Sequence, residues 1–208
     1  MIETEFIREY LKKNVVVICD IMKSLEHSCW SDLDEAIKLI YASFLSDGRL
    51  LVCGNGGSAA DAQHLTSELV ATFARGEQRK PLSAISLSSD ISTITAYAND
   101  FDYAQIFSRQ VAAHGRKGDC LLAISTSGKS KNVIEAVKQA RKLEMKSITI
   151  TGLRGTELSK LSNVVIQVPS QDTQIIQNVY QFLTHVICFG IEELIVKSVK
   201  NPSNFHTT

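Results

Sequence analysis

The sequence predicts an α/β fold, a doubly wound, five-stranded parallel sheet flanked by helices and preceded by an N-terminal helical extension. Its short apolar runs are continuous rather than alternating, which is typical of parallel strands buried on both faces. Helical stretches separate these runs, and the alternation of strand and helix favours a doubly wound sheet. The expected strands cover residues 50–53, 82–87, 120–124, 147–150 and 164–168.

Two helices are expected within residues 3–46. Apolar residues recur at helical spacing from Phe6 to Ile21, and Ser31 with Asp32 predicts the N-cap of the second helix. Gly48 is expected to end that helix, because glycine is common just after a helix. Later helices are expected at about 58–74, 90–97, 103–113, 129–143, 155–161 and 171–197.

The chain of 208 residues is long enough for one domain with a proper core. We expect the helices of residues 1–46 to pack on this domain or on a neighbouring subunit. The α/β domain itself is expected at 47–197, followed by a loose tail at 198–208.

The charge balance indicates which classes of partner the protein can bind. Lys plus Arg and Asp plus Glu each number 22, so the net charge is zero, which argues against non-specific binding to nucleic acid. Small ligands and protein surfaces are the expected partners. The five cysteines form no C-x-x-C pair, which argues against disulfides and thiolate zinc and favours a reducing compartment.

Two features indicate a cytoplasmic protein without a membrane span. The acidic N-terminus has no apolar core of a signal peptide. The longest uncharged stretch, 173–191, contains amides and a histidine that are costly in lipid, so it reads as a buried helix.

The first candidate loop follows the first strand and opens a helix, and its residues are Gly54, Asn55, Gly56, Gly57, Ser58 and Ala59. Glycines let the backbone approach a phosphate, and a helix N-terminus offers unpaired N–H groups. The loop also fits a G-x-G-x-x-A dinucleotide fingerprint, but its companion acid would be Asp90, later than the usual spacing. The alternative is a tight strand-to-helix turn.

The second candidate loop follows the third strand and carries four hydroxyls, those of Ser125, Thr126, Ser127 and Ser130. Such a cluster at a helix start predicts a site for a phosphomonoester. The alternative is an ordinary helix cap, which needs one hydroxyl. Lys129 does not lie in a P-loop frame.

Two helices carry candidate metal ligands. His64 and Glu68 are four residues apart and therefore share a helix face. Gln177, Gln181 and His185 repeat at the same interval in the last helix and need polar partners there. Such groups can be ligands of a divalent metal, or a catalytic base with a second group that assists it. The alternative for His64 with Glu68 is a surface contact, and the alternative for His185 is a core histidine with its hydrogen bonds satisfied.

The chain resembles the phosphoheptose isomerases of the sugar isomerase (SIS) superfamily over roughly 34–196. The segments that carry the resemblance are 54–58, 62–64, 67–69, 97–100, 107–110, 124–127 with Ser130, and 168–170. The resemblance implies a sugar-phosphate-binding SIS domain that converts sedoheptulose 7-phosphate to D-glycero-D-manno-heptose 7-phosphate. It also implies the first step of activated-heptose synthesis for bacterial surface polysaccharide, and a cytoplasmic homotetramer with active sites between subunits and one zinc ion per site.

The resemblance also implies residue roles. Zinc ligands would be His64, Glu68, Gln177 and His185, with Glu68 and His185 also the catalytic acid/base pair. Substrate contacts would come from Asn55, Gly56, Gly57, Ser58, Glu68, Asn99, Asp100, Ser125, Thr126, Ser127, Ser130, Asp172 and Gln177.

The chain departs from the family pattern near the substrate. Thr72 occupies a position where many relatives carry an arginine, and Arg75 or a residue of a partner subunit could take over its role. Ile175 occupies a second position where relatives commonly carry an arginine. A non-catalytic SIS protein, of the kind that binds a replication initiator or senses a sugar phosphate, is the main alternative. Retention of the four implied ligands favours the enzyme over that alternative, and the hydroxyl-rich loop disfavours a nucleotide-binding Rossmann domain.

Overall fold

The computed structural model describes residues 4–74, 79–153 and 156–200. Five parallel strands pair in the order β2-β1-β3-β4-β5, which confirms the predicted fold class. Leu50 pairs with Ala84 on one side and with Cys120 on the other. The strands are β1 (Leu50–Gly54), β2 (Ala84–Ser86), β3 (Cys120–Ser125), β4 (Lys146–Thr151) and β5 (Val164–Gln167).

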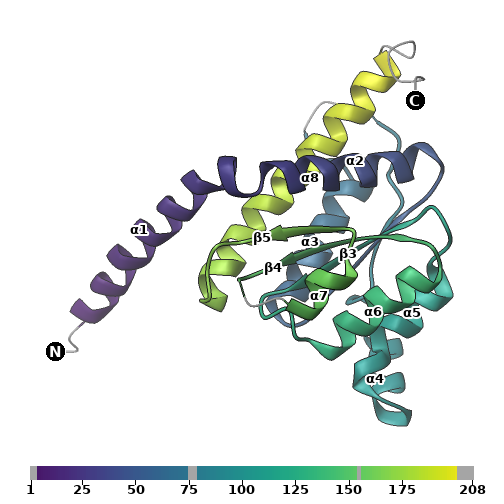
Figure 1. The fold of residues 1–208 in the computed structure, drawn as a ribbon, viewed down its shortest axis with the longest axis horizontal. Helices are drawn as coiled ribbons and strands as arrows, with labels where there is room; N and C mark the ends of the chain where they lie inside the picture. The colour runs from purple at the N-terminus through teal and green to yellow at the C-terminus, as the bar shows by residue number, and fades with distance from the viewer. Residues whose placement is uncertain (1–3, 75–78, 154–155, 201–208) are drawn as a thin grey trace.

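Helices cover both faces of the sheet (Figure 1). They are α1 (Glu5–Ser28), α2 (Trp30–Leu45), α3 (Gly57–Val70), α4 (Ile91–Asp100), the 3-10 turn η1 (Tyr103–Gln105), α5 (Ile106–His114), α6 (Lys131–Lys142), α7 (Thr156–Leu161) and α8 (Thr173–Lys200). Val52 and Leu122 pack with α2, α3 and α8, whereas Leu51 and Leu121 pack with α5 and α6 on the opposite face. The central strands are therefore buried on both faces, as their continuous apolar runs predict.

Several predicted boundaries are wrong by a few residues. The helix α2 begins at Trp30, because the backbone oxygen of Cys29 accepts from the N–H of Leu33 and no side chain caps the helix. The strand β2 has only three residues, since it is an edge strand that pairs with β1 alone. The last helix continues to Lys200, three residues beyond the predicted end.

The N-terminal helix α1 projects from the body of the protein (Figure 1). Only Ile21 and Leu25 of this helix are buried. Its exposed apolar side chains are Phe6, Ile7, Tyr10, Leu11, Val15, Val16 and Val17. Across the described ranges, no helix combines the length and apolar character needed to cross a membrane.

Candidate active site

Both predicted loops lie at one edge of the sheet, where β1 and β3 end side by side. The strand order 2-1-3-4-5 reverses direction between β1 and β3, and the carboxyl ends at such a reversal form a ligand-binding crevice. The topology therefore brings the glycine loop and the hydroxyl loop to the position where a ligand of this fold is expected.

The glycine loop has three positions that require glycine, and at the first of them a Cβ atom on Gly54 would lie 2.6 Å from the backbone oxygen of Ser58. Gly56 precedes α3 with a φ of 55°, a left-handed conformation that glycine adopts without strain. A Cβ atom on Gly57 would lie 2.1 Å from Nε2 of Gln177, so glycine there permits the approach of α8. Ser58 is buried in the first turn of α3, and the turn thus serves packing as well as ligand access.

Asn55 links the glycine loop to α6 and η1 through its side chain. Its amide and that of Asn132 exchange two hydrogen bonds of 2.8 Å, and the hydroxyl of Tyr103 donates to Asn55 Oδ1 at 3.0 Å. A cleft of about 350 Å³ is lined by these three residues together with Ser130. Asn132 and Tyr103 are not among the residues predicted from the sequence, because neither belongs to one of the motifs described above.

The hydroxyl loop is not an ordinary helix cap. Ser130 precedes α6 but makes no side-chain cap hydrogen bond, and its Oγ lies 3.1 Å from Oγ of buried Ser125. The Oγ of exposed Ser127 accepts from the backbone N–H of Lys129 at 3.2 Å, and Thr126 is half-buried between them. Several hydroxyls thus gather at the N-terminus of a 12-residue helix, where an anion is favoured.

Helices α3 and α8 lie side by side and point the same way. Gly57 contacts Gln177, and further along the helices His64 contacts His185. Beyond that, the thiol of Cys188 lies 3.9 Å from the backbone oxygen of Leu65. We call this line of contacts the α3–α8 seam.

Three predicted metal ligands converge on the α3–α8 seam. Nε2 of His64 lies 3.1 Å from Oε1 of Glu68 and 3.4 Å from Nε2 of His185. One donor atom from each residue lies within 4.8 Å of the other two, and all three residues are half-buried. In a tetrahedral zinc site with metal–nitrogen distances of about 2.1 Å, neighbouring donors lie about 3.4 Å apart. The donor types and spacings therefore fit zinc.

The other polar residues of α8 lie elsewhere. Gln177 lies about two helical turns before His185, and its amide contacts Gly57 of the glycine loop. Gln181 is exposed, so the prediction that three polar groups form a row with buried partners is wrong for this residue. Burial raises the pKa of the Cys188 thiol to about 12, so this neighbouring thiol stays protonated.

Three predicted acidic or amide positions are exposed. Asn99 and Asp100 end the helix α4, which has no buried residue, and the Asn99 amide donates to the Asp100 carboxylate at 2.8 Å. Figure 1 shows α4 projecting from the domain, away from α8. The carboxylate of Asp172 accepts from the N–H of Gln174 at 2.8 Å and so caps α8. Asp90 likewise caps α4 through Thr93 rather than following β2 directly.

Comparisons with known proteins identify the family. The SIS domain family model matches residues 15–152. A phosphoheptose isomerase of Aromatoleum aromaticum is 49% identical over 164 residues, which is 77% of this chain and 82% of that protein. One from Helicobacter pylori strain P12 is 41% identical over 92% of this chain and 94% of its own length.

The chain belongs to the phosphoheptose isomerases of the SIS-domain family. A solved phosphoheptose isomerase from Francisella tularensis superposes with a TM-score of 0.83 at 36% identity, covering 93% of this chain and all of that one. Fold and family thus agree along nearly the whole chain.

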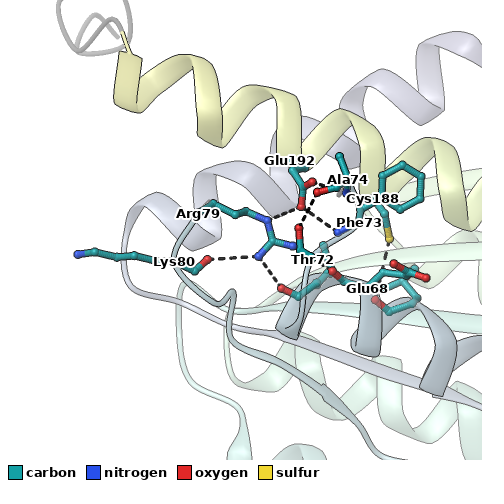
Figure 2. Close-up of polar contacts among 10 residues, drawn as sticks. Glu68, Thr72, Phe73, Ala74, Arg79, Lys80, Cys188 and Glu192 are labelled. Carbon is teal, nitrogen blue, oxygen red and sulfur yellow. Dashed lines mark hydrogen bonds and ion pairs between the residues drawn. The ribbon is translucent and has the colours of Figure 1, made fainter. Parts of the chain in front are cut away.

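A buried arginine lies beside the position where Thr72 departs from the phosphoheptose isomerase pattern. Arg75 lies outside the described residues, but the Arg79 guanidinium reaches the C-terminal end of α3 and pairs with Glu192 of α8 (Figure 2). The side chains of this pair are only 2% and 4% exposed. The pair was not predicted from the sequence, although Glu192 follows His185 by seven residues, two turns along the same helix face.

Proposed function

We propose that this protein interconverts sedoheptulose 7-phosphate and D-glycero-D-manno-heptose 7-phosphate, as a ketose–aldose isomerase of the phosphoheptose isomerase family. One observation carries the proposal. His64, Glu68 and His185 converge within 4.8 Å of one another in a chain that also presents a hydroxyl-lined loop at a helix N-terminus. The first group suits proton transfer on a sugar, and the second suits its phosphate.

The hydroxyl loop holds the phosphate in this proposal. Ser125, Thr126, Ser127 and Ser130 donate to its oxygens, and the N-terminus of α6 adds the favourable end of a helix dipole. The glycine loop meets the sugar chain through its backbone, because the Asn55 side chain is already bonded to Asn132 and Tyr103. Asn99, Asp100 and Asp172 are further proposed substrate contacts.

The reaction moves a carbonyl from C2 to C1. A proton leaves C1, the C1–H electron pair becomes a C1=C2 double bond, and the carbonyl pair moves to O2, which gives an enediolate. A proton then adds at C2 while O1 loses its proton and becomes the new carbonyl. Glu68 takes the C1 proton and delivers one to C2, and His185 moves the proton between O1 and O2.

We propose a zinc ion held by His64, Glu68 and His185. Gln177 is the proposed fourth ligand, and its amide would have to turn from Gly57 toward the other three donors to bind the ion. When bound, the ion polarises the substrate carbonyl and stabilises negative charge on oxygen. A carboxylate or imidazole loses basicity as a ligand, so Glu68 and His185 cannot be ligand and proton carrier at the same moment. The spacing of the three donors supports this site.

A homotetramer with active sites shared between subunits is the proposed assembly. The exposed apolar side chains of α1 support it, as do Phe182 and Phe189, which are 46% and 55% exposed on α8. Light scattering at micromolar concentration together with an activity titration tests the assembly. A 23 kDa monomer with full specific activity at every dilution would rule out shared sites.

The cytoplasm is the proposed location, and the described cysteines support it because each is a free thiol. The proposed place in metabolism is the first step of activated-heptose synthesis. A non-catalytic SIS protein is not favoured, since the acid/base and metal residues are retained.

The direct test of the activity uses deuterated water. Purified protein is incubated with sedoheptulose 7-phosphate, and the product is expected to be an aldose that carries deuterium at C2. Absence of any aldose from zinc-loaded protein would overturn the proposed function.

A further inference from the structure

The buried side chains of Arg79 and Glu192 hydrogen-bond to each other and to backbone groups at and just after the C-terminal end of α3. Arg79 Nε donates to Glu192 Oε2, and its Nη1 and Nη2 donate to the backbone oxygens of Leu69 at 2.8 Å and Glu68 at 2.9 Å (Figure 2). The last carbonyls of a helix have no partner within it. Arg79 therefore fixes the backbone of Glu68, whose side chain belongs to the proposed metal site.

Glu192 fixes the segment that follows α3. Its carboxylate accepts from the backbone N–H of Ala74 at 2.7 Å and from that of Phe73 at 3.1 Å. The ring of Phe73 lies 5.8 Å from the ring of His185, between centroids, at an angle of 49°. Glu192 thus holds a side chain that packs against a second residue of the proposed metal site.

The pair also joins the two helices that form the α3–α8 seam. Glu68 lies on α3 and His185 on α8, so the distance between their side chains depends on how the two helices are held against each other. We propose that Arg79 and Glu192 are positioning residues, which fix Glu68 and His185 relative to each other and thereby set the affinity of the site for zinc. This inference rests on the proposed metal site.

The chemistry of the pair suits positioning better than stability alone. An apolar pair of similar volume often stabilises a fold as well as a buried ion pair does. Only a guanidinium offers a rigid fork that reaches a carboxylate and two carbonyls together, and an ammonium in its place cannot do so. Arg79→Lys therefore keeps the charge but loses the geometry.

The test measures zinc affinity by competition with a chromophoric chelator, alongside kcat and KM. The variants are Arg79→Lys and the double variant Arg79→Met/Glu192→Gln, which leaves no lone charge buried. We expect zinc affinity to fall about 10–100-fold in both, as for other groups that orient metal ligands. We expect kcat to fall with it and KM for the sugar phosphate to change less than about twofold.

The matched control is Arg49→Lys. Arg49 pairs with buried Asp119 at 3.7 Å at the opposite, amino-terminal end of the sheet. Its variant is expected to lose thermal stability and keep the wild-type zinc affinity.

Wild-type zinc affinity in both Arg79 variants would overturn the inference. So would an equal loss of affinity in Arg49→Lys, because affinity would then follow general stability. If the wild type isomerises the sugar without binding zinc, the zinc site and this inference fail while the proposed function stands. If the wild type binds zinc without isomerising the sugar, the proposed function fails, and the affinities still decide the inference.

Discussion

His64 and His185 are 121 residues apart in the chain, yet their Nε2 atoms lie 3.4 Å from each other. Their rings meet edge to face, with centroids 5.0 Å apart and planes at 85°. These two nitrogens and a carboxylate oxygen of Glu68 are the three donor atoms of the proposed metal site. Because Glu68 contacts the same His64 atom, the three side chains are expected to act as a unit.

Glu68→Gln and His185→Gln are each expected to lower turnover by at least two orders of magnitude. Proton transfer by a positioned group contributes about 10²–10⁴-fold, and both residues are proposed to transfer protons. Because they act as a unit, the double variant should lose little more than either single variant. Steady-state kinetics check this, with thermal melts to show that the fold is intact.

The control for Glu68→Gln is Glu193→Gln, a half-buried carboxylate on α8 that pairs with Lys197. It is expected to keep wild-type turnover. Near wild-type turnover in Glu68→Gln would remove that residue from the mechanism.

Ser125→Ala and Ser127→Ala are expected to weaken substrate binding without abolishing the reaction. A hydrogen bond to a charged partner contributes about 1.5–3 kcal/mol, so each loss should raise the dissociation constant at least about tenfold. Isothermal titration with sugar phosphate measures it, and Ser198→Ala, near the far end of α8, is the control. Tight binding of NAD or ATP in competition with the sugar phosphate would instead support a nucleotide site.

Gly57→Ala is expected to act through Gln177. The new Cβ would lie 2.1 Å from Nε2 of Gln177, and the amide must therefore move. Turnover should fall about 10–100-fold, as for other small misplacements in active sites. Adding Gln177→Ala to Gly57→Ala should then cost little more.

The control for Gly57→Ala is Gly118→Ala. Gly118 has a φ of 94° and open space around it, at the amino-terminal end of β3. Its variant should lose about 1–2 kcal/mol of stability and keep its turnover. A Gly57→Ala protein with wild-type kinetics would show that the position of Gln177 does not matter.

Glu192 is expected to make stability depend on pH in acid. Burial alone would raise the pKa of its carboxyl, but hydrogen bonds from Ala74, Phe73 and Arg79 outweigh burial and hold the pKa below its ordinary value of 4.5. A lowered pKa in the folded state adds stability above about pH 4.5, and this stability is lost as pH falls through the folded-state value. Glu192→Gln should be less stable at neutral pH and show a flatter decline in acid.

The control for this pH effect is Glu144→Gln. The Lys117 ammonium, by a hydrogen bond, also lowers the pKa of Glu144, but both side chains of that pair are exposed. Solvent screens such pairs, so the acid profile of this variant should match the wild type. Thermal melts between pH 3 and 7 compare the three proteins, and identical profiles for Glu192→Gln and wild type would contradict the prediction.

The strands and both loops were predictable because their signals are local. Continuous apolar runs mark the central strands, and glycines and hydroxyls mark the loops that follow β1 and β3. The pairing of Arg79 with Glu192 was not predictable, since 113 residues separate them and nothing in either segment names the other. The capping role of Asp172 depends on where α8 begins, and such boundaries are the least certain part of sequence reasoning.

Gln177, His185 and Glu192 follow one another along α8 at intervals of eight and seven residues, over about 22 Å of helix. Each meets a different point of α3 or of the segment after it. One inserted or deleted residue between them would rotate the rest of α8 by about 100° relative to α3. The contacts of Gln177 with the glycine loop, of His185 with His64, and of Glu192 with the segment after α3 could then no longer form together. This stretch of the chain can therefore evolve by substitution but not by change of length, and insertions are expected only outside residues 177–192.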